Sequence, residues 1–181
     1  MSEKIIKISL VSNAGLLLQI DTVKILLDAI WQQSEAYSSP PQEIQTQWLS
    51  GDRRKKWCNV DYVICTHLHN DHFEETAIID YLKHNTVREV WFAPQDGYAS
   101  DQLCNYLSTA DIRHRDISTE SGKCRRFKIN EQLTIAVIGT AHMGANADES
   151  HNAILITYYD KNILLVADAE FPEDTFKQVL G

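Results

Sequence analysis

The sequence predicts a mixed α/β fold, and three observations lead to that prediction. Short apolar runs bounded by turn residues alternate with stretches that have helical periodicity. The runs on either side of a central helical stretch suggest a βαβ unit. The 181 residues, 44% of them hydrophobic, are ample for one hydrophobic core and few for two. We therefore expect residues 1–181 to form a single domain.

The N-terminal region is expected to begin with three short strands, at residues 4–11, 14–20 and 23–27. Asn13 and the pair at 21–22 are typical turn residues and separate these strands. A meander of neighbouring strands is therefore predicted at the start of the domain.

Residues 31–58 are rich in Ser, Pro and Gln and also carry Trp31, Tyr37, Trp48 and Trp57. A loop of this length is usually either functional or disordered, and its aromatic residues favour a folded one. Two interpretations remain open: a lid that faces a substrate, or a loop packed onto the edge of the core.

The rest of the chain continues the alternation of strands and helices. The βαβ unit consists of a strand that ends at residue 64, a helix over 73–84 and a strand over 87–92. Further elements are expected in the following order: a helix over 98–109, a strand over 112–117, a basic turn at 123–126, strands over 133–138, 153–159 and 163–167 with a hairpin turn at 160–162, and a helix from 173.

Composition limits the classes of partner. The net charge of -8 argues against a general affinity for nucleic acids or anionic membranes, because neutralising phosphates needs a basic face. The four cysteines form no CxxC pair, and the N-terminal segment resembles neither a signal peptide nor a membrane span. We expect a cytoplasmic protein whose substrate is a small molecule or a phosphodiester.

Four potential metal ligands lie within six residues directly after a predicted strand: His67, His69, Asp71 and His72. Imidazole nitrogens with one carboxylate suit zinc or a similar divalent ion. Alternate residues of an extended segment share a face, so His67 and His69 can reach one ion. Asp71 and His72 follow where the chain turns toward a helix and point elsewhere, which suggests two adjacent metal ions.

The segment from Thr66 to His72 resembles the HxHxDH motif of the metallo-β-lactamase superfamily, and the resemblance extends from about residue 5 to the end. It implies an αββα sandwich, in which two sheets pack face to face with helices outside. It also implies that Asp168 bridges the metals, although the family usually has Gly where Ala167 stands, and that Asp28 supports the metal loop from behind. The family's last strand, which carries a further His, has no counterpart before Gly181, so the last strands are expected to be missing.

The resemblance places the third ligand of the first metal upstream of Asp168, and two histidines are candidates. His142 lies just beyond a predicted strand and among small residues, and we favour it. His151 is the alternative ligand; it could instead be a hydrogen-bonding partner of a ligand, a substrate contact or a surface residue.

These residues indicate a metal-dependent hydrolase. A divalent ion lowers the pKa of bound water from about 16 to about 7, which makes a metal-bound hydroxide available at neutral pH. Asp71 is expected to orient this hydroxide and carry its proton, while the metals polarise an ester, phosphoester, thioester or lactam. Two zinc ions are expected, and manganese or iron would fit the same ligands.

A non-catalytic or partner-completed metal-binding module of the same fold is the alternative, because the family's final His has no counterpart. The sequence does not specify the substrate, the metal or the oligomeric state. A second copy or a missing C-terminal segment would be expected to cover the exposed edge of a truncated sandwich.

Overall fold

The computed structural model describes residues 5–32, 36–95, 100–144, 150–170, 173, 176 and 177. The chain forms two compact units, Met1–Asp116 and Ile117–Gly181. The first two residues of the helix predicted over 98–109, and most of the helix predicted from 173, lie outside the described residues.

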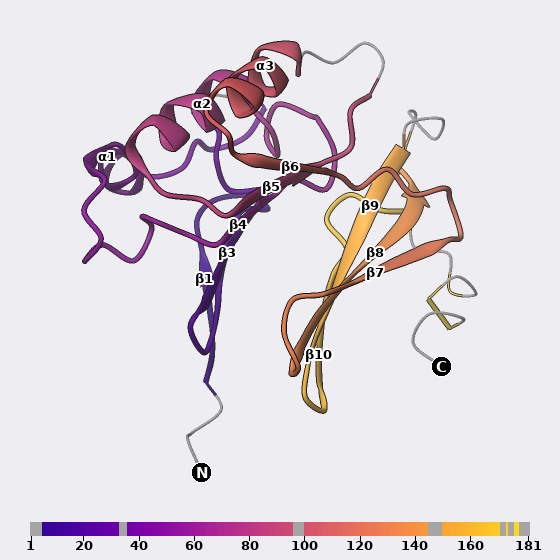
Figure 1. Ribbon diagram of the computed structural model, residues 1–181. Helices are drawn as coiled ribbons and strands as arrows, with labels where there is room; N and C mark the ends of the chain where they lie inside the picture. The colour runs from indigo at the N-terminus through magenta and orange to yellow at the C-terminus, as the bar shows by residue number, and fades with distance from the viewer. Residues whose placement is uncertain are drawn as a thin grey trace. The chain divides into compact units, whose positions relative to one another are not determined.

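Within its described residues, the first unit contains a six-stranded mixed sheet (Figure 1). The first three strands form the predicted antiparallel meander, and the next three run parallel to the third. In sheet order they are β1 (Ile6–Leu10), β2 (Leu16–Ile20), β3 (Val23–Leu27), β4 (Tyr62–Ile64), β5 (Glu89–Phe92) and β6 (Arg113–Asp116). The predicted βαβ unit is therefore confirmed.

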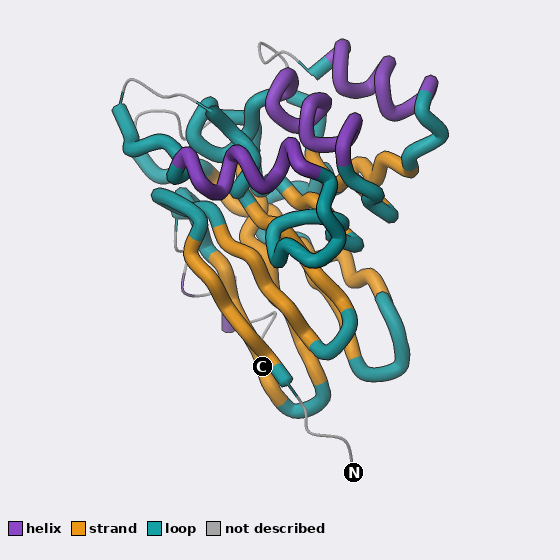
Figure 2. The backbone as a smooth tube through the Cα atoms, turned by 90° about the vertical axis from the view of Figure 1, so that its left-hand side faces the viewer, coloured by secondary structure: helices purple, strands orange, loops and turns teal. Residues whose placement is uncertain are grey.

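Three helices lie along one face of this sheet (Figures 1 and 2): α1 (Gln42–Ser50), α2 (Glu75–His84) and α3 (Asp101–Thr109). The shared core includes Leu26, Val63 and Val90 from the strands and Ile78 and Leu103 from the helices. Full burial of a side chain of this size contributes roughly 1.5–3 kcal/mol, so this layer fixes the strand ends and the loops that follow them. Among the described residues, no helix is both long and apolar enough to span a membrane.

The structure corrects the expectation of one long loop over residues 31–58, because α1 lies within it. Trp31, Trp48 and Trp57 are buried, and the last two belong to the core of the first unit. Tyr37 is 47% exposed. The tryptophans therefore support packing onto the core and not a lid over a substrate.

The sequence did contain boundary signals for α1. Pro41 occupies the N-cap position, where its missing N–H costs nothing, and Gly51 ends the helix in the left-handed conformation at φ 60°. A Cβ at Gly51 would lie 2.5 Å from the carbonyl oxygen of His84. Both the left-handed conformation and this close approach therefore require glycine at the position.

The second unit contains, within its described residues, a four-stranded antiparallel sheet (Figure 1). Its order is β10 (Lys161–Leu165), β9 (Ser150–Tyr158), β8 (Leu133–Ala141) and β7 (Cys124–Lys128). Ala136, Ile138, Ala153 and Leu155 form the centre of its core. These strands confirm the predicted β-rich end of the chain and the mixed α/β class.

Two local predictions in this unit were wrong. Residues 123–126, predicted as a basic turn, mostly belong to β7, an edge strand whose charged side chains are tolerated because one side faces solvent. The hairpin turn predicted at 160–162 lies one residue earlier, because Lys161 already pairs with Tyr158. Tyr159 adopts φ 52° in that turn.

Glu89 is a buried carboxylate at the start of β5, on the sheet face opposite Val90. It accepts hydrogen bonds from Arg115 Nε at 2.9 Å, Trp91 Nε1 at 2.8 Å and Arg113 Nη1 at 3.0 Å. Burial opposes ionisation, but the bonds from Arg115 and Trp91 together with the arginine charges outweigh it and lower the pKa of Glu89. The carboxylate therefore stabilises the fold in its charged form.

Replacing Glu89 with Gln should lower the free energy of unfolding by about 1–3 kcal/mol at pH 7, because the amide loses the charge-assisted bonds. The folded-state pKa lies below the ordinary value of 4.5, so the wild-type advantage is present above that value and is lost as the pH falls through the folded-state pKa. Urea unfolding at pH 7 and at progressively lower pH measures the difference. A deficit that does not shrink with falling pH would contradict this account.

Candidate metal centre

The histidine-rich loop begins where β4 ends and occupies the carboxyl end of a parallel strand, where open α/β sheets commonly bind ligands. Cys65 N donates to the carbonyl oxygen of Trp91, which continues the strand pairing by one residue. The chain then turns, and the N–H groups of His72 and Phe73 both donate to the carbonyl oxygen of His69, at 2.9 and 2.8 Å. Asp71 and His72 therefore lie in a turn before α2, as expected.

This turn brings three imidazole rings together. The ring of His67 lies 4.5 Å from that of His69 and 4.2 Å from that of His72, measured between centroids. His67 and His72 are also buried. A cluster of imidazoles beside a carboxylate has the donor chemistry that a divalent metal ion requires.

Asp28 supports this loop from the end of β3 and is fully buried. Its Oδ1 accepts the backbone N–H of Thr66 at 2.8 Å, and its Oδ2 accepts the Thr66 hydroxyl at 2.8 Å. Oδ2 also lies 3.1 Å from Nδ1 of His72. The predicted hydrogen bonds from the metal loop to Asp28 are thus present.

These contacts set the proton positions on two rings. An ionised carboxylate only accepts, so the approach of Asp28 Oδ2 to within 3.1 Å of Nδ1 favours a proton on that nitrogen of His72. The Thr66 hydroxyl gives its single proton to Asp28 and therefore accepts from Nδ1 of His67, 3.1 Å away. On both rings Nε2 is then the nitrogen that can bind a metal ion.

Asp71 has a hydrogen-bonding partner that no local sequence pattern could predict. Its Oδ2 accepts a hydrogen bond from Nδ2 of Asn13 at 2.9 Å and lies 3.4 Å from Nε2 of His72. Asn13 belongs to the turn between β1 and β2, 58 residues earlier, and sequence reasoning assigned it only a turn role. Only the fold brings the two residues together.

Cys65, which precedes the loop, is buried within the core of the first unit. Burial and, to a smaller extent, the nearby Asp28 charge raise the pKa of its thiol well above the ordinary value of 9.0. The thiol therefore stays protonated at neutral pH, which agrees with a packing role and not with a nucleophilic one.

In the second unit, the structure brings His142 and Asp168 together. His142 directly follows β8 and forms a β-bridge with Ala169. Its Nδ1 donates to the carbonyl oxygen of Met143 at 2.8 Å, and its Nε2 lies 3.6 Å from Oδ2 of Asp168. A backbone bond from Met143 N to the carbonyl oxygen of Asp168, 2.8 Å long, holds the two segments together.

Ala167 adopts φ 46°, in the left-handed region that favours glycine. This backbone conformation agrees with the glycine that is usual at this position in the family that the sequence resembles. In this protein an alanine adopts the same left-handed conformation.

His151 is fully buried in β9, so the interpretation of it as a surface residue was wrong. The Thr140 hydroxyl lies 3.2 Å from its Nδ1 and 3.4 Å from its backbone carbonyl oxygen, and it can donate its single proton to either. The rings of His151 and His142 lie 5.9 Å apart. Both histidines therefore remain candidates for the third ligand.

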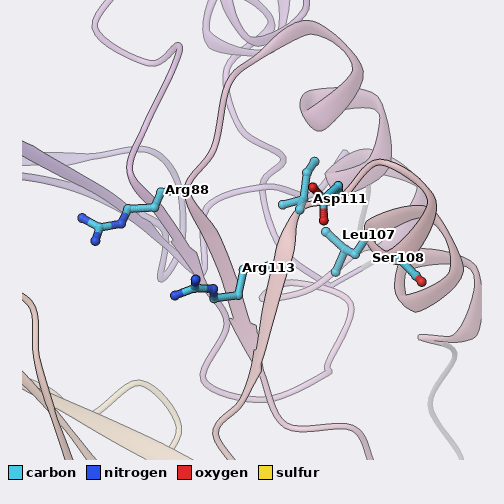
Figure 3. A pocket seen from close by; sticks show the side chains of 6 residues that line it. Arg88, Leu107, Ser108, Asp111 and Arg113 are labelled. Atoms are coloured by element: carbon cyan, nitrogen blue, oxygen red, sulfur yellow. The ribbon is translucent and has the colours of Figure 1, made fainter.

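A cavity of about 560 Å³ lies elsewhere in the first unit (Figure 3). It is lined by Arg88, Leu107, Ser108, Asp111, Ile112 and Arg113. Arg88 immediately precedes β5 and Arg113 begins β6, so this cavity lies at the amino ends of the parallel strands. The histidine loop follows a carboxyl end, and the cavity is therefore not part of the candidate metal centre.

Replacing Asp28 with Asn should weaken metal binding about 10- to 100-fold, because the amide no longer favours the Nδ1 proton on His72 or on His67. It should also lower the free energy of unfolding by about 1–3 kcal/mol. Zinc titration against a competing chelator and thermal unfolding measure the two effects.

Asp61 provides a matched control, because its Oδ2 accepts the backbone N–H of Lys24 at 2.8 Å just before β4, at the end of the strand away from the histidine loop. Asp61→Asn should lower stability without changing metal affinity. Unchanged metal affinity in a folded Asp28→Asn protein would show that the support role is wrong.

Comparison with known proteins gives a family match over nearly the whole chain. The model of the metallo-beta-lactamase superfamily matches residues 10–180. The comparison with curated proteins gave no match.

Solved structures of similar fold include a protein described as a metal-dependent hydrolase from Parabacteroides distasonis, 17% identical, with a TM-score of 0.55 over 93% of this chain and 63% of that one. An isothiocyanate hydrolase from Delia radicum gut bacteria is 20% identical, with a TM-score of 0.60 over 96% and 66%. CmlA, a diiron β-hydroxylase from Streptomyces venezuelae, is 13% identical, with a TM-score of 0.64 over 99% and 33%.

At these identities the solved structures show a shared fold, and the chain spans 63% of the length of the first of them. The family match, in contrast, covers both units and includes the histidine loop, His142 and Asp168. The chain belongs to the metallo-β-lactamase superfamily.

Proposed function

We propose that this protein is a metal-dependent hydrolase with a two-metal centre. The proposed ligands of the first ion are His67, His69 and His142, and those of the second are Asp71, His72 and the bridging Asp168. This assignment is supported by the family match over residues 10–180 and by the presence of imidazoles and a carboxylate in each unit.

The observation that carries the proposal is the Asp28 network. A buried carboxylate that directs the protons of His67 and His72 to Nδ1 leaves their Nε2 atoms as metal donors. A purely structural loop has no need for such tautomer control. The carbonyl oxygen of Met143 likewise favours a proton on Nδ1 of His142, because a carbonyl oxygen can only accept.

When bound, divalent ions lower the pKa of coordinated water toward about 7 and stabilise negative charge that develops on the substrate. Asp71 is the residue proposed to orient the attacking water and accept its proton, because a carboxylate is a suitable general base. The substrate class proposed is an ester, phosphoester, thioester or lactam. The net charge of -8 favours a small substrate over a long polyanion.

Zinc is the proposed metal, because three neutral nitrogens with one open position suit a tetrahedral zinc ion. Iron or manganese could occupy the same ligands, and CmlA is a diiron protein of similar fold. The first experiment therefore has to identify the bound metal.

The test combines elemental analysis of the purified protein with a panel of chromogenic phosphodiesters, esters, thioesters and lactams. Two bound ions with turnover of at least one substrate class are expected. His67→Ala should lose both metal and turnover, whereas His84→Ala, an exposed histidine at the end of α2, should keep both. One ion or none, without turnover, would favour the non-catalytic or partner-completed module.

Calorimetric metal titration tests the two-ion assignment. We expect one tight and one weak event, because the first ion has three imidazole ligands that suit a tetrahedral ion, whereas the ligands proposed for the second are Asp71, His72 and Asp168. His142→Ala should remove the tight event. A tight event that survives this change but disappears in His151→Ala would reassign the third ligand to His151.

A further inference from the structure

We propose that Asn13 is the positioning residue for Asp71 and that it sets the affinity of the second metal ion separately from the first. The inference rests on the proposed function and concerns a residue outside its ligand set. The observation behind it is the 2.9 Å hydrogen bond from Asn13 Nδ2 to Asp71 Oδ2.

The direction of this bond is fixed by chemistry. An ionised carboxylate can only accept, so the Asn13 amide must present its NH₂ group to Asp71. Asp71 is only 6% exposed, and Asn13 reaches it from an exposed turn. The bond to Asn13 thus restricts rotation of the carboxylate that is proposed to bind a metal ion and to move a proton.

The turn that carries Asn13 is itself held in place. Val11 N donates to the carbonyl oxygen of Gly15 at 2.7 Å, which closes the turn, and Val11 is buried. Gly15 packs so closely on the end of β3 that a Cβ there would lie 2.9 Å from both Ala29 Cα and the carbonyl oxygen of Asp28. The turn that carries Asn13 therefore packs against the end of β3, where Asp28 also supports the histidine-rich loop.

The two supports act on different ligands. Asp28 contacts His72 directly and reaches His67 through Thr66. Asn13 contacts Asp71. Loss of Asn13 should therefore disturb the ion that Asp71 binds and leave the first ion's histidines in their orientation.

The experiment is a zinc titration by calorimetry of the wild type, Asn13→Ala and Asn13→Asp, followed by the absorption spectrum of each protein loaded with cobalt. The weak event should weaken about 10- to 100-fold in Asn13→Ala, while the tight event stays within about threefold. Asn13→Asp keeps the size but places a second carboxylate against Asp71, so it should weaken the same event at least as much. The cobalt bands of the second site should change in both variants.

Ser12→Ala is the matched control, because it alters the same turn without removing the donor to Asp71. It should retain both events and the wild-type spectrum. If Asn13 only stabilised the turn, its loss would weaken both events together or lower the thermal stability alone, and either result would overturn the proposal. Two wild-type events that persist unchanged in both Asn13 variants would also overturn it, whereas a wild type that binds no metal would overturn the proposed function itself.

Discussion

The buried carboxylate of Asp28 connects the parts of the first unit that matter for function. Asp28 follows β3, accepts two hydrogen bonds from Thr66 and faces His72. A residue at the end of β3 therefore holds the loop that follows β4, the neighbouring strand. Burying a charge is costly unless donors surround it. The contacts with Thr66 and His72 that offset this cost also favour protons on Nδ1 of His67 and His72. Stability and metal-binding chemistry therefore depend on one group.

The same arrangement recurs in the second unit with different oxygens. Nδ1 of His142 faces the carbonyl oxygen of Met143, and Nδ1 of His151 faces Thr140. For His142, whose Nδ1 faces a carbonyl oxygen, Nε2 is left as the potential metal donor. A sheet of strongly paired strands can hold such contacts, because each histidine lies within or directly beyond a strand, or in the loop that follows one. The fold thus orients the proposed metal ligands in the metal-free protein.

Sequence reasoning succeeded where the signal was local. The spacing of the histidine loop, the position of Asp28 at a strand end and the strands before and after them could all be predicted from short segments. It failed for α1, whose boundary residues Pro41 and Gly51 lie in a segment of loop-like composition, and for β7, whose charges are typical of a turn. The Asn13 contact could not be predicted, because it joins residues 58 positions apart that share no pattern.

The claim that Asp28 sets the tautomers can be tested directly by long-range ¹H–¹⁵N correlation NMR of the histidine rings in the metal-free protein. The account predicts that His67 and His72 carry their proton on Nδ1 and leave Nε2 unprotonated at neutral pH. It also predicts that this preference weakens in Asp28→Asn. Protons on Nε2 of these rings, or doubly protonated rings at neutral pH, would contradict it.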